Sequence, residues 1–420
     1  MKARLLVPIV FGCIWGLMPS SLAAQTADDR AATGNPLAFT ASDDLQVNVL
    51  AKFQSDFYEL SPSFVPDDDG FNWTRRRIGV EGTFLKHFEF QIEREIRRDN
   101  PWRDVFVDFQ YFRNARLRGG KFKIPFGLDQ LTNPARLDFV YRSRIGELLS
   151  PGRDLGMAVH GRFWNRALGY EAGVFRHDGE KARFQQNPGA DLTWAGRVTA
   201  RPFRPLTKAA VRSLELGFNA TVGSVPEGLH GLRGRTTFDE TFFEPVYVNG
   251  RRVRMGMDLS WTPGPFSLKS ELIRLEDERR GQGLIGDDLP SIVSNGWYVS
   301  GSWVATGERK TARVEPRRPL FQGGVGAIEL AARYEQLGFG SPSADGGLED
   351  VAPALHPRAA RLTSVRDHLV SVGVNWYLNR WVRVQVNAIR EDGAESLFRD
   401  DSGAVIEPFL IYVCRLQFSL

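Results

Sequence analysis

The chain has 420 residues, a formal net charge of +4 and two cysteines. This length exceeds what most single hydrophobic cores use, yet no linker-like stretch divides the chain, so one large all-β domain is compatible with it. Because the net charge is small, any positive field must come from the placement of charges and not from their sum.

The first residues have the pattern of a secretory signal peptide. Lys2 and Arg4 precede an apolar run from Leu5 to about Met18, and small residues continue to Ala24. We predict a signal peptide at residues 1–23, with an uncleaved anchor as the alternative. Its removal takes away two basic residues and no acid, which changes the formal charge from +4 to +2.

Cysteine content and hydropathy exclude two further classes of protein. Without the signal peptide only Cys414 remains, so an intramolecular disulfide and a small disulfide-stabilised scaffold are excluded. No later stretch approaches 18 consecutive apolar residues, so the sequence predicts no membrane-spanning helix.

Apolar residues recur with a period of two along the remaining chain, which predicts strands with one apolar and one polar face. The pattern is clearest at 370–378 and 382–388, on either side of a turn at Asn379 and Arg380. In chain order, strands are expected at residues 45–58, 72–84, 88–98, 103–113, 115–124, 154–164, 168–176, 192–201, 212–223, 251–262, 266–277, 296–306, 325–337, 370–378, 382–388 and 411–420.

An even number of two-faced strands of about ten residues is typical of an outer-membrane barrel. The alternative is a large soluble sandwich, but its strands average only about 5–6 residues. Short and long connections alternate as a barrel requires, except that 307–324 is long where a short periplasmic turn is expected. We therefore predict an all-β fold, a 16-stranded antiparallel transmembrane β-barrel at 45–420, preceded by an N-terminal periplasmic segment at 24–44.

The polar stripe of such a barrel faces its lumen, and sixteen strands leave an aqueous channel there. An enzymatic barrel is the competing class. The six histidines form no arrangement of the kind that outer-membrane hydrolases use, so we expect no enzyme, and no motif predicts a metal, a cofactor or nucleic-acid binding.

Several motifs resemble the phosphate-selective porins O and P. They include GKFKIPFGL at 120–128, SPGRDLG at 150–156, RIGVEG at 77–82, GWYV at 296–299 and NWYLN at 375–379, in order over almost the whole mature chain. The resemblance implies a homotrimer of sixteen-stranded barrels in the bacterial outer membrane, with a third outer loop folded inward as a constriction. Here that loop is about Pro125 to Arg153. It also implies that inward-facing arginines and lysines lead anions, phosphate or polyphosphate above all, through the pore.

Residue parity along the strands selects the basic side chains expected to line the pore. Lys121 and Lys123 alternate with Phe122 and Ile124, which are expected to face lipid or a partner subunit. The other pore-lining candidates are Arg75, Arg77, Arg197, Arg252, Arg254, Arg333 and Arg383, and those in the constriction loop are Arg136, Arg142, Arg144 and Arg153.

Acidic residues share the predicted lumen face, which keeps other interpretations open. The basic residues could instead pair with these carboxylates and brace the wall, and a mixed-charge lumen would suit a broad-specificity porin for small solutes. A third possibility is an adhesin or assembly barrel with a closed lumen. Arg76 has the opposite parity, lies beside an outer loop and is expected to contact lipopolysaccharide phosphate. The acidic lumen residues are Glu81, Glu89, Glu93, Asp108, Asp258 and Glu329.

Overall fold

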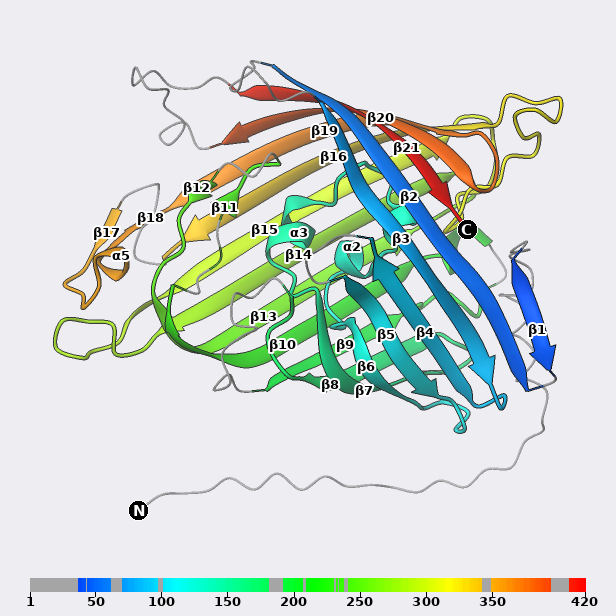
Figure 1. Cartoon of the computed structure of the whole chain (residues 1–420). Coiled ribbons are helices and arrows are strands. Elements are labelled where there is room, and N and C mark those ends of the chain that lie inside the picture. Colours follow the sequence, from blue (N-terminus) through cyan, green and yellow to red (C-terminus); the bar gives the residue numbers. More distant parts are fainter. Residues whose placement is uncertain are drawn as a thin grey trace.

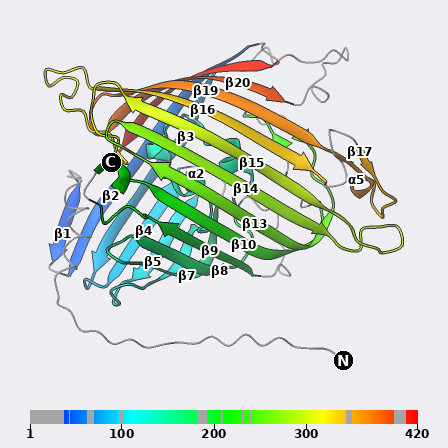
Figure 2. The same ribbon diagram turned by 180° about the vertical axis from the view of Figure 1, so that it is seen from behind.

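Sixteen antiparallel strands form a closed barrel (Figures 1 and 2). The computed structural model describes residues 37–42, 44–61, 70–96, 101–180, 192–206, 209–229, 232, 234–237, 241–341, 349–393 and 408–420. The predicted signal peptide at 1–23, and residues 24–36 and 43 of the predicted N-terminal segment, lie outside these ranges. The last strand, β21, pairs with the first barrel strand, β2, which also pairs with β3, so the sheet has no free edge.

Each predicted strand is present, which confirms the fold class. The barrel strands are β2 (Leu45–Ser61), β3 (Phe71–Phe84), β4 (Phe88–Glu95), β5 (Trp102–Phe109), β6 (Arg116–Lys123), β7 (Arg153–Phe163), β8 (Leu168–Phe175), β9 (Thr193–Ala200), β10 (Glu215–Gly228), β13 (Val248–Trp261), β14 (Phe266–Arg279), β15 (Leu289–Val304), β16 (Ala327–Gly340), β19 (Val365–Tyr377), β20 (Val382–Gly393) and β21 (Phe409–Ser419). A further strand that was not predicted, β1 (Ala38–Ser42), pairs with the start of β2.

Paired strands carry the alternation across the wall in continuous rows. Leu330, Val374 and Val386 are successive cross-strand partners and are 42 to 50% exposed, so their row forms part of the outer surface. One residue later along β19, Asn375 pairs with Glu329 and Gln385, and all three are fully buried on the inner side. The outer row suits contact with lipid because its side chains are apolar. The closed barrel also pairs its backbone groups internally, as a membrane-spanning structure must.

The two ends of the barrel differ. At the turn end, connections such as 85–87, 164–167, 262–265 and 378–381 are short; at the loop end lie 124–152, 229–247 and 341–364. The long connection 305–326 belongs to the turn end, where the Leu320 N–H donates to the Leu378 carbonyl at 2.7 Å. It is therefore an elaborated turn, as the strand count requires.

Short elements occupy the lumen and the loop end. The constriction loop, 124–152, carries α2 (Leu128–Leu131), η1 (Pro134–Arg136) and α3 (Arg144–Leu148), and α2 and α3 are seen inside the barrel in Figure 1. None of the described helices is long and apolar enough to cross a membrane. The remaining elements are α4 (Ala209–Arg212), β11 (Gly234–Arg235), β12 (Thr241–Phe243), β17 (Glu349–Val351), α5 (Pro357–Ala360) and β18 (Arg361–Thr363).

An apolar cluster fills part of the lumen near the loop end. Phe126 and Ile145 of the constriction loop meet Phe242 and Phe243 of β12 and Phe339 of β16. The rings of Phe243 and Phe339 stack with centroids 5.0 Å apart. This interior packing holds the constriction loop against β12 and β16.

Candidate functional site

The constriction loop is fixed to the wall through its own backbone. At the start of α2, the N–H groups of Leu128 and Asp129 donate to the two carboxylate oxygens of Glu271 on β14, at 2.8 and 3.1 Å. These donors have no partner within the helix, and a carboxylate at a helix N-terminus satisfies them. Gly127 precedes them with φ of +80°, a conformation that favours glycine, so the GKFKIPFGL motif ends where the chain turns into the helix.

The opposite wall holds the middle of the loop. Arg383 on β20 donates to the Leu137 carbonyl at 2.9 Å, and Arg415 on β21 donates to the Val140 carbonyl at 2.6 Å. The Val140 N–H donates to Asn387 at 2.7 Å. The loop therefore spans the lumen from β14 to β21.

Two predicted cations bind carbonyl groups of the loop itself. Lys123 donates to the carbonyls of Gln130, Leu131 and Thr132 at 2.6 to 3.1 Å, and Arg142 donates to the Thr132 carbonyl at 2.7 Å and to that of Asp129. These carbonyls lie at the C-terminal end of α2, where a positive charge is favoured. Lys123 thus positions the constriction loop.

A group of five cations gathers where this loop approaches β2, β3 and β21. The charges of Arg415, Arg77 and Arg142 all act on Arg75, and those of Arg142 and Arg77 act on Lys123. Arg75 is partly exposed, and its guanidinium donates to the neutral amide oxygen of Gln54 at 2.6 Å. We call Arg75, Arg77, Lys123, Arg142 and Arg415 the constriction cations.

One comparison with known proteins identifies the family of the chain. A family profile described as "Phosphate-selective porin O and P" matches residues 47–418. The chain belongs to the phosphate-selective porin O and P family. This makes it a porin of the bacterial outer membrane, and the resemblance noted from the motifs is confirmed.

Solved structures similar to this porin share its fold at low identity. An anion-selective porin from Comamonas acidovorans is 13% identical, with a TM-score of 0.56 over 90% of this chain and 100% of that one. OmpT of Vibrio cholerae, in its trimer form, is 12% identical, with a TM-score of 0.55 over 90% and 100%. The outer-membrane channel DcaP of Acinetobacter baumannii is 9% identical, with a TM-score of 0.52 over 91% and 99%. No curated protein sequence matches the chain.

Most other predicted cations of the porin lie buried in ion pairs. Burial would raise the pKa of Asp178, but the guanidinium of Arg254 and then that of Arg252 bring it below its ordinary value. Pairs of this kind brace the wall. They are Arg197 with Asp258 at 2.6 Å, Arg252 with Asp178 at 2.9 Å, Arg254 with Asp178, Arg333 with Glu335 at 2.9 Å and Arg153 with Asp104 at 2.7 Å. Of the constriction cations, Arg77 is paired with Glu95 and Arg415 with Asp56, each at 2.6 Å.

Two candidates of the constriction loop take other positions. The Arg144 guanidinium donates to the Thr236 carbonyl at 2.7 Å and so ties α3 to the segment after β11. Arg136 lines a pocket toward the turn end. Asp138, between them in the loop, accepts from Lys269 and Lys310, each at 2.6 Å. Burial would raise the pKa of Asp138, and these two ammonium groups lower it below its ordinary value.

The end of β6 departs from the predicted alternation. Phe122 and Ile124 are 1% and 0% exposed, so the expectation that they face lipid or a partner subunit is wrong. Phe122 packs on Phe175, with ring centroids 5.2 Å apart, and the Arg118 guanidinium lies 5.3 Å from its centroid. Gly120 has φ of +132°, outside the conformation of a regular strand, so faces counted by parity across it do not hold.

Lys121 lies apart from the constriction cations. Its ammonium group donates to the Trp102 carbonyl at 3.0 Å, and its residue stays partly exposed. The structure thus separates the two lysines of the motif: Lys123 holds the constriction loop and Lys121 lies on the wall beside β5.

Sequence reasoning missed several basic residues of the site. Arg415 has the lumen parity of its strand, so the rule that selected Arg383 could also have selected it. Lys310, Arg313 and Arg380 lie in turns that have no strand pattern, and parity offers no signal there. Among the described residues, no group of three or more His, Cys, Asp or Glu side chains is placed to hold a metal ion.

Proposed function

We propose that this porin is an anion-preferring diffusion channel whose permeant is phosphate or polyphosphate. Three of the constriction cations, Arg75, Lys123 and Arg142, carry the proposal. Arg75, Lys123 and Arg142 have amide or carbonyl oxygens as their close partners, and the carboxylate nearest to Arg142 is that of Asp129 at 3.8 Å. Their charge is therefore little neutralised at close range where the loop narrows the channel.

The chemistry of permeation is passive exchange of hydration. An oxyanion that enters the narrow zone loses water, and guanidinium forks can replace that water with charge-assisted hydrogen bonds. Conduction also requires that the anion leaves again, which several moderate sites allow better than one tight site. Arg75 on β3, Lys123 at the end of β6 and Arg142 in the constriction loop are distributed in a way that suits that requirement.

The assembly follows from the same proposal. We infer a homotrimer with one pore in each barrel, supported by the trimer form of the structurally similar OmpT and by the family resemblance. We further infer contact of the outer wall with outer-membrane lipid, and of Arg76 with lipopolysaccharide.

A broad-specificity porin is the second candidate function, and the buried ion pairs favour it. Arg197, Arg252 and Arg254 are each paired with a carboxylate and so contribute little net charge to the lumen. A lumen of balanced charge would admit small neutral solutes as readily as anions.

Two measurements on the purified porin decide between these candidates. Inorganic phosphate added to a planar bilayer should reduce the chloride current of an anion channel with phosphate sites, because phosphate occupies the constriction. Porin-containing liposomes should swell rapidly in neutral sugars only if the channel is broad. Swelling without phosphate block would contradict our proposal and support the second candidate, and a channel without any conductance would contradict both.

A further inference from the structure

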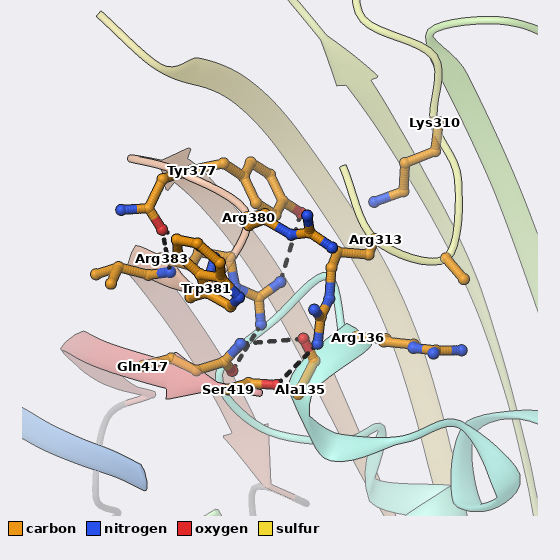
Figure 3. Close-up of a pocket in the computed structure, with 13 residues that line it drawn as sticks. Ala135, Arg136, Lys310, Arg313, Tyr377, Arg380, Trp381, Arg383, Gln417 and Ser419 are labelled. Atoms are coloured by element: carbon orange, nitrogen blue, oxygen red, sulfur yellow. Dashed lines mark hydrogen bonds between the residues drawn. The ribbon is translucent and has the colours of Figure 1, made fainter. Parts of the chain in front are cut away.

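The first half of connection 305–326 turns toward the lumen. Lys310 binds Asp138 of the constriction loop at 2.6 Å. The side chain of Arg313 lies beside that of Arg136 from η1, as Figure 3 shows. Contacts inside the barrel therefore account for this half of the connection.

The second half lies over the outer rim of the barrel, and we call residues 318–326 the rim turn. Its Leu320 N–H donates to the Leu378 carbonyl, and the indole N–H of Trp376 donates to the Val325 carbonyl, both at 2.7 Å. Trp376 follows the outward alternation of β19 and is 37% exposed, so this bond holds the rim turn on the lipid side of the wall. In Figures 1 and 2 the connection, drawn in yellow, extends beyond the ends of β15 and β16.

Two large apolar side chains of the rim turn are exposed. Phe321 is 90% exposed and Val325 is 66% exposed. Phe321 also has φ of +68°, a left-handed conformation that strains a bulky residue, whereas Gly323 adopts a similar φ without that cost. A strained and exposed aromatic ring adds little to packing within the described chain. It points to an apolar surface outside the chain.

The wall beside the rim turn has the side chains of a membrane interface. Near the turn end, Phe266 is 51% and Trp303 is 44% exposed, and their rings stack with centroids 6.3 Å apart. Ile328 pairs with Trp376 at the same end of β16 and β19. In outer-membrane barrels, aromatic side chains gather at the level of the lipid headgroups. The rim turn, bonded to Trp376, continues this aromatic row.

The charge of the rim turn also suits a lipid surface. The sequence at 317–326 contains two arginines and no Asp or Glu. Arg318 is exposed, and its carbonyl accepts from the Gly326 N–H at 3.0 Å, which closes the turn. An exposed guanidinium beside an apolar tip can bind a headgroup phosphate while the tip enters the acyl region.

We propose that the rim turn docks onto the periplasmic leaflet of the outer membrane. Phe321 and Val325 enter the upper part of the acyl chains, and Arg318 binds the phosphate of a phospholipid headgroup. The occupant is a phospholipid surface because the rim turn is continuous with the lipid-facing wall and combines an apolar tip with a cation. The inference rests on the place of the barrel in the outer membrane and not on which solute permeates.

Docking of the rim turn explains the length of the connection. Its first half reaches the constriction loop through Lys310 and Asp138, and its second half reaches the leaflet through Phe321. A short turn could not reach both places. Connection 305–326 thereby joins the membrane to the constriction loop.

The test measures whether the rim turn lies in lipid. Gln322, an exposed neighbour of Phe321, is changed in Gln322→Cys within a Cys414→Ser background, and the introduced thiol is labelled with bimane. The porin is reconstituted in phosphatidylcholine vesicles with and without bromine near the top of the acyl chains. Because bromine quenches at close contact, the loss of fluorescence gives the ratio of lipid-inserted to free label.

We expect strong quenching in the otherwise wild-type porin. Phe321→Ser with Val325→Ser should lower the ratio of inserted to free label by about tenfold or more, since burial of one Phe side chain is worth at least that factor. Arg318→Gln should lower it by about twofold, as for an exposed ion pair. The matched control is Ile285→Ser, which removes a 91% exposed apolar side chain at the loop end and should leave the ratio unchanged.

Two results would overturn the proposal. A label that bromine does not quench would show that the rim turn lies in water or against another protein or a second copy of the chain. Undiminished quenching in Phe321→Ser with Val325→Ser would show that these side chains do not hold the turn in the leaflet. Phe321→Leu keeps an apolar side chain and should retain most of the quenching, which distinguishes docking from a general change of the turn.

Discussion

The ion pairs of Lys310, which join connection 305–326 to the constriction loop and to β16, are expected to stabilise the folded porin. Lys310 is 8% exposed; its ammonium group binds Asp138 at 2.6 Å and also Glu329. Replacing it in the variant Lys310→Met removes both ion pairs while it keeps the length of the side chain. The ion pair that joins connection 305–326 to Asp138 of the constriction loop is then lost.

The loss of stability in Lys310→Met follows from the geometry of these ion pairs. Two unit charges 2.6 Å apart attract by about 6 kcal/mol at an effective dielectric constant of about 20, and removing one partner of a buried pair costs about 3–5 kcal/mol net. Here the loss is smaller, because Asp138 keeps Lys269 at 2.6 Å and Glu329 keeps the Tyr377 hydroxyl at 2.7 Å. We expect the free energy of unfolding to fall by about 2–3 kcal/mol.

Urea unfolding in phospholipid vesicles, followed by tryptophan fluorescence, measures this change. Lys86→Met, at an exposed lysine of the turn between β3 and β4, is the matched control and should change the free energy by less than about 0.5 kcal/mol. In a double-mutant cycle, Asp138→Asn should cost less in the Lys310→Met background than alone. Equal stability of wild type and Lys310→Met, or strict additivity with Asp138→Asn, would refute the reasoning.

Three further predictions concern charge and exposure. Arg75→Gln with Arg142→Gln should lower the chloride-to-potassium permeability ratio by up to about tenfold per charge, since a positive charge about 6 Å away stabilises an anion and destabilises a cation by about 0.7 kcal/mol each in a water-like dielectric; an unchanged ratio would show that these cations do not act on the permeant. The pKa values of Asp138 and Asp178 are lower in the folded chain than the ordinary value of about 3.9, so their stabilisation is present above about pH 4 and is lost as the pH falls below it. Urea midpoints should therefore drop in acid, and less so in Asp138→Asn; equal slopes would speak against this assignment. Cys414 lies in an exposed apolar row of the outer wall and should react with a water-soluble maleimide only after unfolding, so labelling of the folded porin in vesicles would contradict a lipid-facing position.

The barrel could be predicted because its strands have a simple local rule. A residue on the outer wall meets lipid and its neighbour meets the lumen, so period-two alternation marks each strand, as the rows through Val374 and Asn375 show. The number and order of the strands follow from counting these alternating segments. Because the count is even, connection 305–326 must lie at the turn end of the barrel. The exact ends, and the added strand β1, depend on pairing that no local pattern records.

The charged interior was harder to predict, for two physical reasons. Parity indicates that a side chain faces inward but not which carboxylate it meets across the lumen, so it could not distinguish Arg252 in its aspartate pairs from Arg75 beside other cations. Parity also fails where the backbone is irregular, as at Gly120, and this placed Phe122 on the wrong side. In loops and turns it has no application, which is why Lys310, Arg313 and Arg380 were not predicted.

The constriction is expected to prefer anions, and the zero-current potential across a bilayer under a tenfold gradient of potassium chloride measures that preference. If the wild-type porin prefers chloride, the dilute side becomes negative and the potential approaches about 59 mV in magnitude as the preference becomes complete. A dilute side that becomes positive would show a preference for potassium and would contradict the account.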